Sequence, residues 1–564
     1  MGLRDSNIRK LNGGTFDVLV VGGGINGAVS AASLASRGAR VAVIDRDDFA
    51  GFTSMQSSNL VWGGFKYLEN YEIKLVRDLC VSRNHLIKAY PANLKEIRFM
   101  AALDTNSPYK PTFAGLGATA YWVIGNGFTK PPKVLTTERI KKKEPVVRVD
   151  NLLGGIEYSD AYIVDNDSRF VFGFIRSALN SGAVCANYVE LDNAELRDGM
   201  WHASLRDTDT GARYTCQAKV VINAAGPYVD EVNRAHEIRT EHKIVFSKGI
   251  HLIVPRIAKS ERVLAFFDDT QRLFYVIPMG PRSVIGTTDE RVTAPETQVN
   301  DEDRDFLLAQ INERLSLEQP LTPADIISSR SGVRPLVVEA AGGDAENEDW
   351  TSLSRKHALE VDRNSNWISI FGGKLTDCVN VGHEVCNEVI ELGVQLSKDK
   401  HSWYGEPPKA TREEFFRQAR LMGLDQLRKR SAFETLSTRL WRRYGLRSFA
   451  MLEAIRDDPT MADDIIEGAD YVRVELFYAA QTEMVTKLDD FLRRRSKIAL
   501  VLSHDEMEGA KGLLEACRLL FGDDAQKRYD EYFTPERRAE YEALRAPTGS
   551  NPAPEGDVVV PTRG

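Results

Sequence analysis

The sequence predicts an α/β protein in which a Rossmann-like domain is interleaved with an antiparallel sheet and followed by a C-terminal helical domain. Three observations indicate this fold. A Val-rich strand, a glycine-rich turn and an Ala-rich helix follow one another near the N-terminus. Val-, Ile- and Phe-rich runs separated by turns occupy residues 240–360, as in an antiparallel sheet. Beyond about residue 400, apolar residues recur at helical spacing.

The strongest motif is FDVLVVGGGINGAVSAASLASRGARVAVID, which spans Phe16–Asp45. Its apolar run Phe16–Val21 predicts a buried strand, Ile25–Ser36 predicts a helix, and Arg40–Ile44 predicts a second strand. Strand, turn, helix and strand in this order are typical of the first unit of a doubly wound sheet.

Three glycines shape the turn in this motif. Gly22 allows the tight turn, Gly24 lets a pyrophosphate approach the backbone, and Gly27 lets helix and strand pack closely. Asp45 ends the second strand about 20 residues further on, where a carboxylate accepts hydrogen bonds from a ribose. The motif therefore predicts a dinucleotide site. The alternative is a nucleotide-free fold whose glycines serve packing alone.

A hydroxyl-rich loop follows, and it ends at a pair of glycines. Small hydroxylated side chains beside a nucleotide donate hydrogen bonds to phosphate oxygens. The residues concerned are Thr53, Ser54, Ser57, Ser58, Gly63 and Gly64.

Several segments, taken in order, resemble the FAD-dependent, quinone-linked glycerol-3-phosphate dehydrogenases. They are the glycine motif, TSMQSS with GGFKYLE, KGIHLIVPR at Lys248–Arg256, IGTTD at Ile285–Asp289, SGVRPL at Ser331–Leu336 and FGGKLTD at Phe371–Asp377. The resemblance extends from residue 16 to about residue 500. It implies FAD as cofactor and oxidation of sn-glycerol 3-phosphate to dihydroxyacetone phosphate. It also implies a membrane quinone as electron acceptor and a homodimer.

The resemblance places FAD contacts on three turns. The strand Lys219–Gly226 ends in the second turn, and Gly372–Thr376 forms the third, where a helix start would stabilise negative charge at flavin N1. Without the resemblance, the residues of both segments fit plain strand-to-helix turns equally well. The implied cofactor contacts are Gly22, Gly24, Ile25, Asn26, Gly27, Asp45, Thr53, Ser54, Ser57, Ser58, Gly63, Gly64, Ala225, Gly226, Gly373, Lys374, Leu375 and Thr376.

The resemblance also implies the substrate residues. His251 and Arg334 would act on the substrate hydroxyl, with His251 as the base. The cations Lys66, Arg355 and Lys374 would bind the phosphate, Tyr67 would donate a hydrogen bond, and Arg272 is a further candidate. Without the resemblance, His251 would be interpreted as a core histidine and Arg334 as a structural ion-pair residue.

Four positions depart from the family pattern. Lys66 stands where arginine is usual, so bidentate phosphate recognition is lost there. Trp62 replaces a histidine, and Asn59 replaces a cation near the cofactor. Asp377 replaces a threonine, and its charge suits a helix start but would repel a phosphate if it faced the pocket.

These departures keep two alternatives open. One is a flavin oxidase or dehydrogenase of another phosphorylated or acidic polyol, with oxygen as acceptor. The other is a flavin-binding scaffold with a decayed site.

The segment Ser107–Lys133 is apolar with lysines at its edges, which suits a membrane interface, although a buried helical hairpin fits the sequence equally well.

The net charge of −8 argues against nucleic acid as the main partner. The six cysteines contain no C-x-x-C pair, which predicts reduced thiols and no metal site. No secretory signal is visible, so we expect a cytoplasmic protein, peripheral on the inner face of the membrane if the family pattern holds.

The predicted organisation interleaves two functions along one core. Residues 1–15 form an N-terminal extension, 16–400 the oxidoreductase core, 401–545 the helical domain and 546–564 a disordered tail. Within the core, the FAD-binding parts are 16–105, 150–235 and 362–400, and the substrate-binding parts are 106–149 and 236–361.

Overall fold

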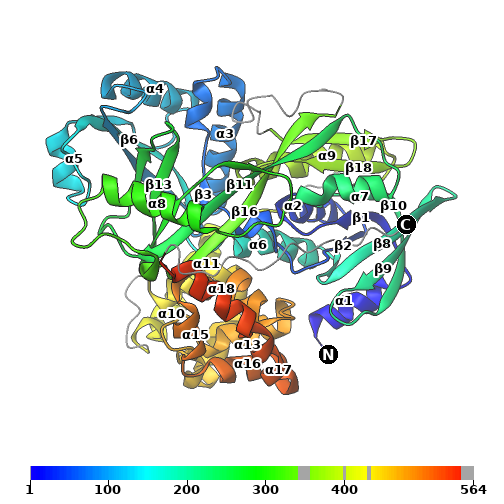
Figure 1. Cartoon of the computed structure of the whole chain (residues 1–564). Helices are drawn as coiled ribbons and strands as arrows, with labels where there is room; N and C mark the ends of the chain where they lie inside the picture. Colours follow the sequence, from blue (N-terminus) through cyan, green and yellow to red (C-terminus); the bar gives the residue numbers. More distant parts are fainter. Residues whose placement is uncertain (1, 341–355, 398–401, 428–433, 548–564) are drawn as a thin grey trace.

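The structure is a computed structural model that describes residues 2–340, 356–397, 402–427 and 434–547. Two sheets lie side by side, and the C-terminal helices pack together beneath them in the view of Figure 1. Arg355 and most of the predicted disordered tail lie outside the described residues.

The first sheet carries the Rossmann-like unit, and its neighbouring strands run in the order β17-β18-β10-β1-β2-β7. The central strands β18, β10, β1, β2 and β7 are parallel to one another, whereas β17 is antiparallel to β18. The hairpin β8–β9 extends β10. The bounds are β1 Gly14–Val21, β2 Val41–Ile44, β7 Val184–Ala186, β8 Val189–Arg197, β9 Met200–Asp207, β10 Arg213–Asn223, β17 Ala358–Asp362 and β18 Trp367–Phe371.

Helices cover this sheet as the hydrophobic pattern requires. Helix α2 (Ile25–Ala35) is buried along nearly its whole length and packs against α6 (Asp167–Asn180) and α9 (Cys378–Glu391). The predicted strand, helix and strand of the glycine motif are therefore confirmed. The predicted N-terminal extension contains α1 (Leu3–Leu11), which packs against β7, and α7 (Val229–Ala235) follows β10.

The second sheet is mostly antiparallel, and its neighbouring strands run in the order β15-β11-β14-β13-β12-β4-β6-β3, with β16 on β11 and β5 on β6. Strands β4 and β6 fall in the predicted FAD-binding parts, yet they belong to this sheet because each pairs with the other over most of its length. The bounds are β3 Leu60–Val61, β4 Leu94–Asp104, β5 Lys133–Leu135, β6 Leu152–Ile163, β11 His242–Pro255, β12 Val263–Phe267, β13 Leu273–Met279, β14 Arg282–Gly286, β15 Glu290–Val292 and β16 Ser328–Glu339.

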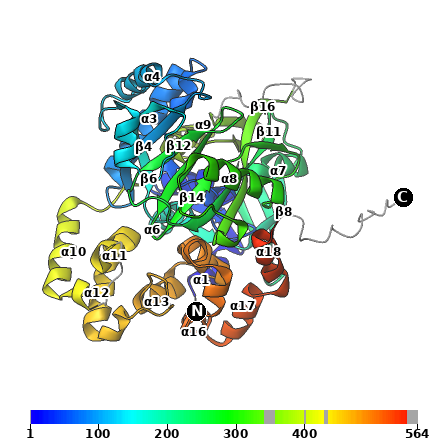
Figure 2. The ribbon, with the colours of Figure 1, turned by 60° about the vertical axis from the view of Figure 1, so that its left-hand side comes forward.

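Four helices accompany the second sheet, and α4 lies at the end of the molecule opposite the C-terminal helices in both views (Figures 1 and 2). Their bounds are α3 Ile73–Ala89, α4 Pro111–Ile124, α5 Thr137–Lys143 and α8 Asp301–Arg314.

The C-terminal part is helical, as predicted, and has apolar clusters of its own around Phe415 and Phe491. A π-helical turn at Asp490–Arg495 precedes α14. The bounds are α10 Lys409–Leu421, α11 Leu436–Tyr444, α12 Ser448–Asp457, α13 Arg473–Thr482, α14 Ile498–Val501, α15 His504–Glu508, α16 Leu513–Phe521, α17 Ala525–Tyr532 and α18 Pro535–Arg545.

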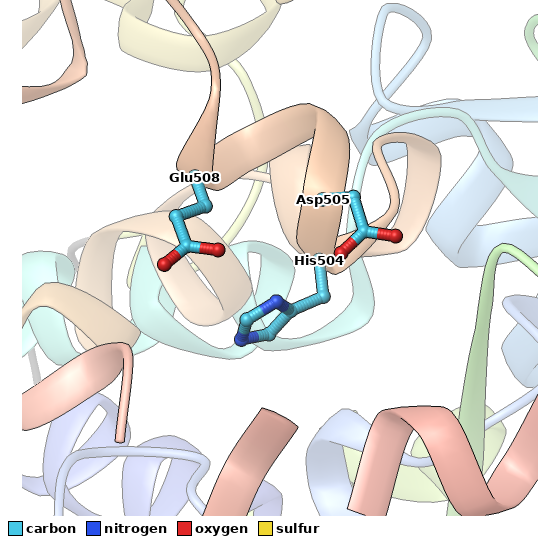
Figure 3. A group of neighbouring side chains, drawn as sticks. All are labelled: His504, Asp505 and Glu508. Carbon is cyan, nitrogen blue, oxygen red and sulfur yellow. The ribbon is translucent and has the colours of Figure 1, made fainter. Parts of the chain in front are cut away.

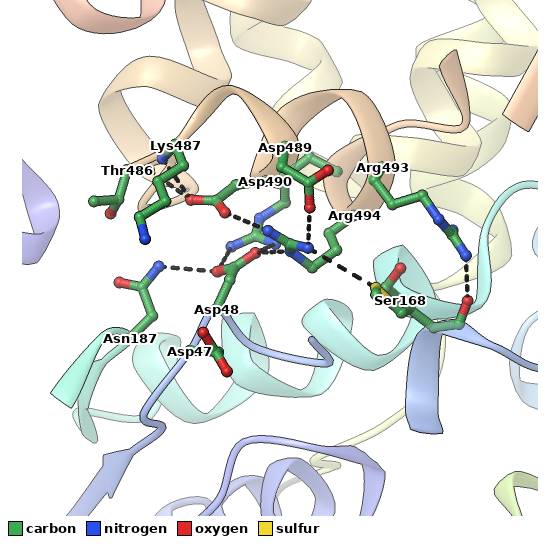
Figure 4. A network of polar contacts seen from close by, with 12 residues as sticks. Asp47, Asp48, Ser168, Asn187, Thr486, Lys487, Asp489, Asp490, Arg493 and Arg494 are labelled. Atoms are coloured by element: carbon green, nitrogen blue, oxygen red, sulfur yellow. Dashed lines mark hydrogen bonds and ion pairs between the residues drawn. The ribbon is translucent and has the colours of Figure 1, made fainter. Parts of the chain in front are cut away.

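A buried ion-pair network joins this helical part to the Rossmann-like unit (Figure 4). The Asp48 carboxylate, just after β2, accepts from Arg494 Nε and from Arg495 Nη1, each at 2.8 Å. Arg494 also donates to Asp490 Oδ1 at 2.6 Å. Burial raises the pKa of Asp48, but the charges of Arg495 and Arg494 outweigh burial and hold that pKa below its usual value. The Arg493–Arg495 cluster is therefore an interdomain cluster, and it is buried.

Replacing Asp48 by Asn should lower the free energy of unfolding by about 3–5 kcal/mol, because Arg494 and Arg495 would stay buried without their shared carboxylate. Denaturant unfolding followed by circular dichroism measures the loss. Asp192→Asn is the matched control, because exposed Asp192 pairs with Arg206 at the surface and such a pair contributes about 1 kcal/mol or less. Equal losses in both variants would contradict the assigned role of Asp48.

Candidate functional site

Three glycine-containing turns meet at one edge of the first sheet, because β1, β10 and β18 are parallel and end there together. Gly22 has φ +100°, and a Cβ on it would lie 2.5 Å from the Ala224 carbonyl oxygen. A Cβ on Gly27 would overlap the Gly22 carbonyl oxygen. These positions therefore admit only glycine, as the motif predicted.

The three turns line one cavity, which runs from the end of β2 to the turn after β18. Its lining includes Gly22, Gly24, Ile25, Asn26, Asp45, Thr53, Ser54, Ala225, Gly226 and Gly373. Asn26 ties the first turn to the third, since its Nδ2 donates to the Gly372 carbonyl oxygen at 2.9 Å. A helix start, close-packed glycines and a concave lining are the features that a bound dinucleotide requires.

Asp45 is held by the backbone at this edge. Its carboxylate accepts from the N–H groups of Gly23 at 2.7 Å and Asp47 at 2.9 Å. Burial raises the pKa of Asp45 to about 7, although the two backbone hydrogen bonds oppose this shift. Contact of Asp45 with a ribose stays a prediction.

The hydroxyl-rich loop divides its side chains between the cavity and the protein interior. Ser54 Oγ accepts from Ile25 N–H at the start of α2, and Thr53 Oγ1 donates to the Val333 carbonyl oxygen. Ser57, in contrast, donates through both N–H and Oγ to the buried Asp167 carboxylate. The hydroxyl proton of Ser57 is therefore used within the protein in this structure, and a contact of Ser57 with the cofactor stays a prediction.

Gly63 likewise faces the interior. Its N–H donates to Asp160 Oδ1 at 3.1 Å, and a Cβ there would overlap the Tyr121 hydroxyl. Close packing against Tyr121 explains this glycine without a cofactor contact.

The predicted base lies on a face shared by β11 and β16. His251 pairs with Arg330 across the two strands, and Ser247 pairs with Arg334, so their side chains share that face. His251 is 4% exposed, and neither ring nitrogen has a hydrogen-bond partner among the described residues. Burial, followed by the charges of Arg330 and Arg334, lowers the pKa of His251 to about 3, so the ring is neutral.

Arg334 joins two of the recognised motifs. Its guanidinium lies over Gly249, where a Cβ would collide with it. It donates to Thr287 Oγ1 at 2.9 Å and to Asp289 Oδ1 at 3.1 Å. Arg272 Nη1 donates to the Asp289 carbonyl oxygen, so Arg272, the further substrate candidate, lies beside Arg334.

A second group of predicted residues gathers at the turn after β18. Lys374 Nζ donates to the Tyr67 hydroxyl and lies 5.8 Å from the centre of the Trp62 ring. Thr376 Oγ1 donates to the Trp62 carbonyl oxygen at 3.2 Å. Lys66 instead lines an apolar cavity on the other side of the 3₁₀ turn Phe65–Leu68.

Two departures from the family pattern are compensated by residues that the sequence reasoning missed. Asn59 Oδ1 accepts from Arg330 Nη1 at 3.0 Å, so a positive charge stands beside Asn59 after all. Asp377 is buried and accepts from His357 Nδ1 at 2.7 Å, which neutralises it. Arg330 directly precedes the matching segment Ser331–Leu336, and this position was the available signal. No sequence signal pointed to His357.

A separate cluster lies on α15, where His504, Asp505 and Glu508 have ligand atoms within 4.8 Å of one another (Figure 3). Glu508 pairs with Arg538, and Asp505 lies 3.7 Å from Arg545. Both carboxylates are thus already paired with arginines.

The family model described as FAD dependent oxidoreductase matches residues 17–347, and the model described as C-terminal domain of alpha-glycerophosphate oxidase matches residues 417–528. The chain is 29% identical to glycerol-3-phosphate dehydrogenase 2 of Mycobacterium tuberculosis, over 91% of this chain and 86% of that one. It is 29% identical to the aerobic glycerol-3-phosphate dehydrogenase of Escherichia coli and 28% identical to the D-erythritol 1-phosphate dehydrogenase of Brucella abortus. Both matches cover 87% of this chain and 96% of the relative.

Solved structures share the fold. The glycerol-3-phosphate dehydrogenase of Bacillus halodurans, complexed with FAD, superposes with a TM-score of 0.71 at 23% identity. That match covers 97% of this chain and 99% of the other. The L-alpha-glycerophosphate oxidase of Mycoplasma pneumoniae, with FAD bound, gives 0.52 at 18% identity over 70% of this chain and 98% of the other.

The His357–Asp377 pair should make stability depend on pH. Burial lowers the pKa of His357, but the hydrogen bonds to Asp377 and Glu384 outweigh burial and raise it to about 9. Because the folded pKa lies above the unfolded value of about 6.5, the stabilisation is complete below pH 6.5 and is lost as pH rises through 9.

The unfolding midpoint of His357→Asn should therefore fall below that of the wild type at pH 6 and approach it at pH 10. His202→Asn, at a half-buried histidine on β9, is the control. A pH-independent difference for His357→Asn would contradict the assigned ion pair.

Proposed function

Because this chain belongs to the family of FAD dependent oxidoreductases, we propose that it oxidises sn-glycerol 3-phosphate to dihydroxyacetone phosphate with FAD as its cofactor. The observation that carries the proposal is the shared face of β11 and β16, on which a neutral, buried imidazole stands between two arginines. That arrangement suits removal of a proton from an alcohol beside an anionic substrate. The names of the dehydrogenase relatives support the substrate class.

The two groups of side chains are linked through one tyrosine. Tyr275 pairs with Gly286, which pairs with His251 on the next strand. Burial raises the pKa of Tyr275, and Asp160 and Tyr67 add to that effect. We therefore infer that His251, Tyr67 and Lys374 act on one small substrate.

Bound FAD supplies a hydride acceptor and later returns the electrons to a second acceptor. In our proposal His251 accepts the hydroxyl proton at a ring nitrogen, since the neutral ring has a free lone pair at working pH. Arg334 donates to the same substrate oxygen as it becomes a carbonyl. Lys374 and Tyr67 bind the phosphate, with Lys66 and Arg355 as the further predicted cations.

The length of the polyol is the finer question. The relative named D-erythritol 1-phosphate dehydrogenase is about as similar to this chain as the glycerol-3-phosphate dehydrogenases are. Two features favour a longer polyol phosphate as the second candidate substrate. Trp62 lies beside Lys374, and Lys66 lines the apolar cavity instead of joining the group around Lys374. The buried contacts of Asp377 with His357 and of Asn59 with Arg330 speak against a decayed site.

An apolar surface supports a membrane quinone as the electron acceptor, which is also part of the proposal. On α4, Phe113 is 63% and Leu116 is 70% exposed, and lysines flank the helix. Beside it lies a largely apolar cavity of about 380 Å³ lined by Phe113, Tyr109, Tyr158 and Lys66. No helix among the described residues is long and apolar enough to cross a membrane. Peripheral attachment through α4 is therefore proposed, with oxygen as the alternative acceptor, and the homodimer stays a prediction.

His251→Asn and Arg334→Ala test the proposed site. Each should slow reduction of bound flavin by glycerol 3-phosphate at least about a hundredfold, since general base catalysis contributes about 10²–10⁴. The flavin content should be unchanged, because neither residue lines the cofactor cavity. In the wild type, the rate of flavin reduction should not decrease as pH falls through 6.5, because the pKa of His251 is lowered to about 3.

Stopped-flow absorbance under anaerobic conditions gives these rates, and the product is identified by NMR. Arg256→Ala is the control, since Arg256 bonds to loop carbonyls at the far end of β11. Near wild-type reduction by His251→Asn would contradict its role as the base. A product other than the ketone would contradict the proposed reaction.

Replacing Phe113 and Leu116 together by Ser should weaken binding to anionic lipid vesicles and slow quinone reduction about tenfold or more. Turnover with a water-soluble dye should change much less than quinone reduction, because α4 carries none of the proposed site residues His251, Arg334 and Lys374. Leu421→Ser is the matched control, since Leu421 is 75% exposed on α10 in the helical part. Unchanged vesicle binding by the double variant would contradict attachment through α4.

A further inference from the structure

Arg330 is a buried cation for which the proposed mechanism has no task. It lies on β16 directly across from His251 on β11, and its residue is only 2% exposed. Directly opposite residues of an antiparallel pair have Cβ atoms about 4.5–5.5 Å apart on the same face. Arg330 is therefore an immediate neighbour of the proposed base.

One edge of its guanidinium is held by the hydroxyl-rich loop. Nη1 donates to the Ser57 carbonyl oxygen and to Asn59 Oδ1, the latter at 3.0 Å. The position of the charge is thus fixed by the loop that passes from the cofactor cavity to the second sheet.

The other edge is unsatisfied. Nε and Nη2 of Arg330 are buried and have no hydrogen-bond partner among residues that the structure describes. Leaving such donors unpaired in a protein interior is costly, so they indicate a group that is bound during function.

The charge around Arg330 is also unbalanced. The facing carboxylate, Asp167, lies 3.6 Å away and already accepts two hydrogen bonds from Ser57. A second buried guanidinium, Arg493, approaches the same loop by donating to the Met55 carbonyl oxygen. Burial and then the charge of Arg330 lower the pKa of Arg493 to about 9, although Asp167 and Asp489 act in the opposite direction. The region therefore favours one further negative charge.

We propose that Arg330 is a further cation of the reaction site, which stabilises the negative charge of reduced flavin and thereby raises the reduction potential of bound FAD. The inference rests on the proposed role of His251, because a base and a hydride acceptor that act on one alcohol must stand on either side of it. The flavin ring is thereby brought close to His251, and so to Arg330.

The electron balance explains why a fixed cation matters here. The alcohol loses a hydride, which carries two electrons and one proton, and its hydroxyl proton passes to His251. Oxidised flavin is neutral, so the added hydride leaves the reduced flavin with one negative charge. A buried positive charge nearby favours the reduced form over the oxidised form, and little water is present to screen it.

The test compares Arg330→Gln, Arg330→Lys and Arg256→Gln, each with FAD bound and without any polyol. Potentials are measured by dye equilibration, and the dissociation constant of the flavin–sulfite complex gives an independent measure of positive charge near the ring. Arg330→Gln should bind sulfite about tenfold or more weakly and should favour reduction at least about tenfold less, which corresponds to about 30 mV for a two-electron couple. Arg330→Lys should stay near the wild type because the charge is kept, and so should Arg256→Gln.

Two results would overturn the proposal. Wild-type potentials and sulfite binding in Arg330→Gln would show that the charge does not act on the flavin. Equal losses in Arg330→Gln and Arg330→Lys would assign it a structural role. If Arg330→Gln does not hold FAD, the Lys variant still decides, since a lowered potential there contradicts a role that depends on charge alone. None of these readouts needs a polyol, so they are independent of whether the proposed substrate is correct.

Discussion

The rest of the structure depends on the close approach of three backbone turns at one edge of the parallel strands β1, β10 and β18. Parallel strands end at the same edge, but only glycine lets the backbone at Gly22 and Gly27 come close enough for the turns to meet. The cavity between them then opens toward β16, whose strand carries Arg330 and Arg334. In our proposal, cofactor binding and substrate binding are thus two consequences of one packing constraint.

Charge is arranged around this constraint in buried pairs. Asp48 binds Arg494 and Arg495 where the helical part docks, and Asp377 binds His357 beside the third turn. Each pair satisfies groups that would be expensive to bury alone. The face of β11 and β16 differs, because Arg330 and His251 keep buried nitrogen atoms without partners among the described residues. Buried nitrogen atoms without partners beside the proposed base make this face a candidate for chemistry.

The fold and much of the site could be predicted from the sequence because their signals are local. The glycine motif, the Val-rich strands and the segment SGVRPL each lie within a few residues of the structure that they form. The features that could not be predicted depend on contacts between residues that lie far apart in the sequence. Ser57 bonds to Asp167, and Arg330 bonds to Asn59 from 271 residues away, so the task of each side chain is set by a partner that no local pattern reveals. For the same reason, the sequence alone could not show that Asn59 lies beside Arg330 and Asp377 beside His357.

The central claim is that a polyol phosphate reduces the flavin held at this edge of the sheet. The most direct measurement is the visible spectrum of the purified FAD-loaded protein under anaerobic conditions, before and after sn-glycerol 3-phosphate is added, with D-erythritol 1-phosphate added to a parallel sample. Our account predicts that the absorption band of oxidised flavin bleaches within the time of mixing with at least one of the two, and with glycerol 3-phosphate if the shorter substrate is correct. A band that dithionite bleaches but neither polyol phosphate changes would contradict the account.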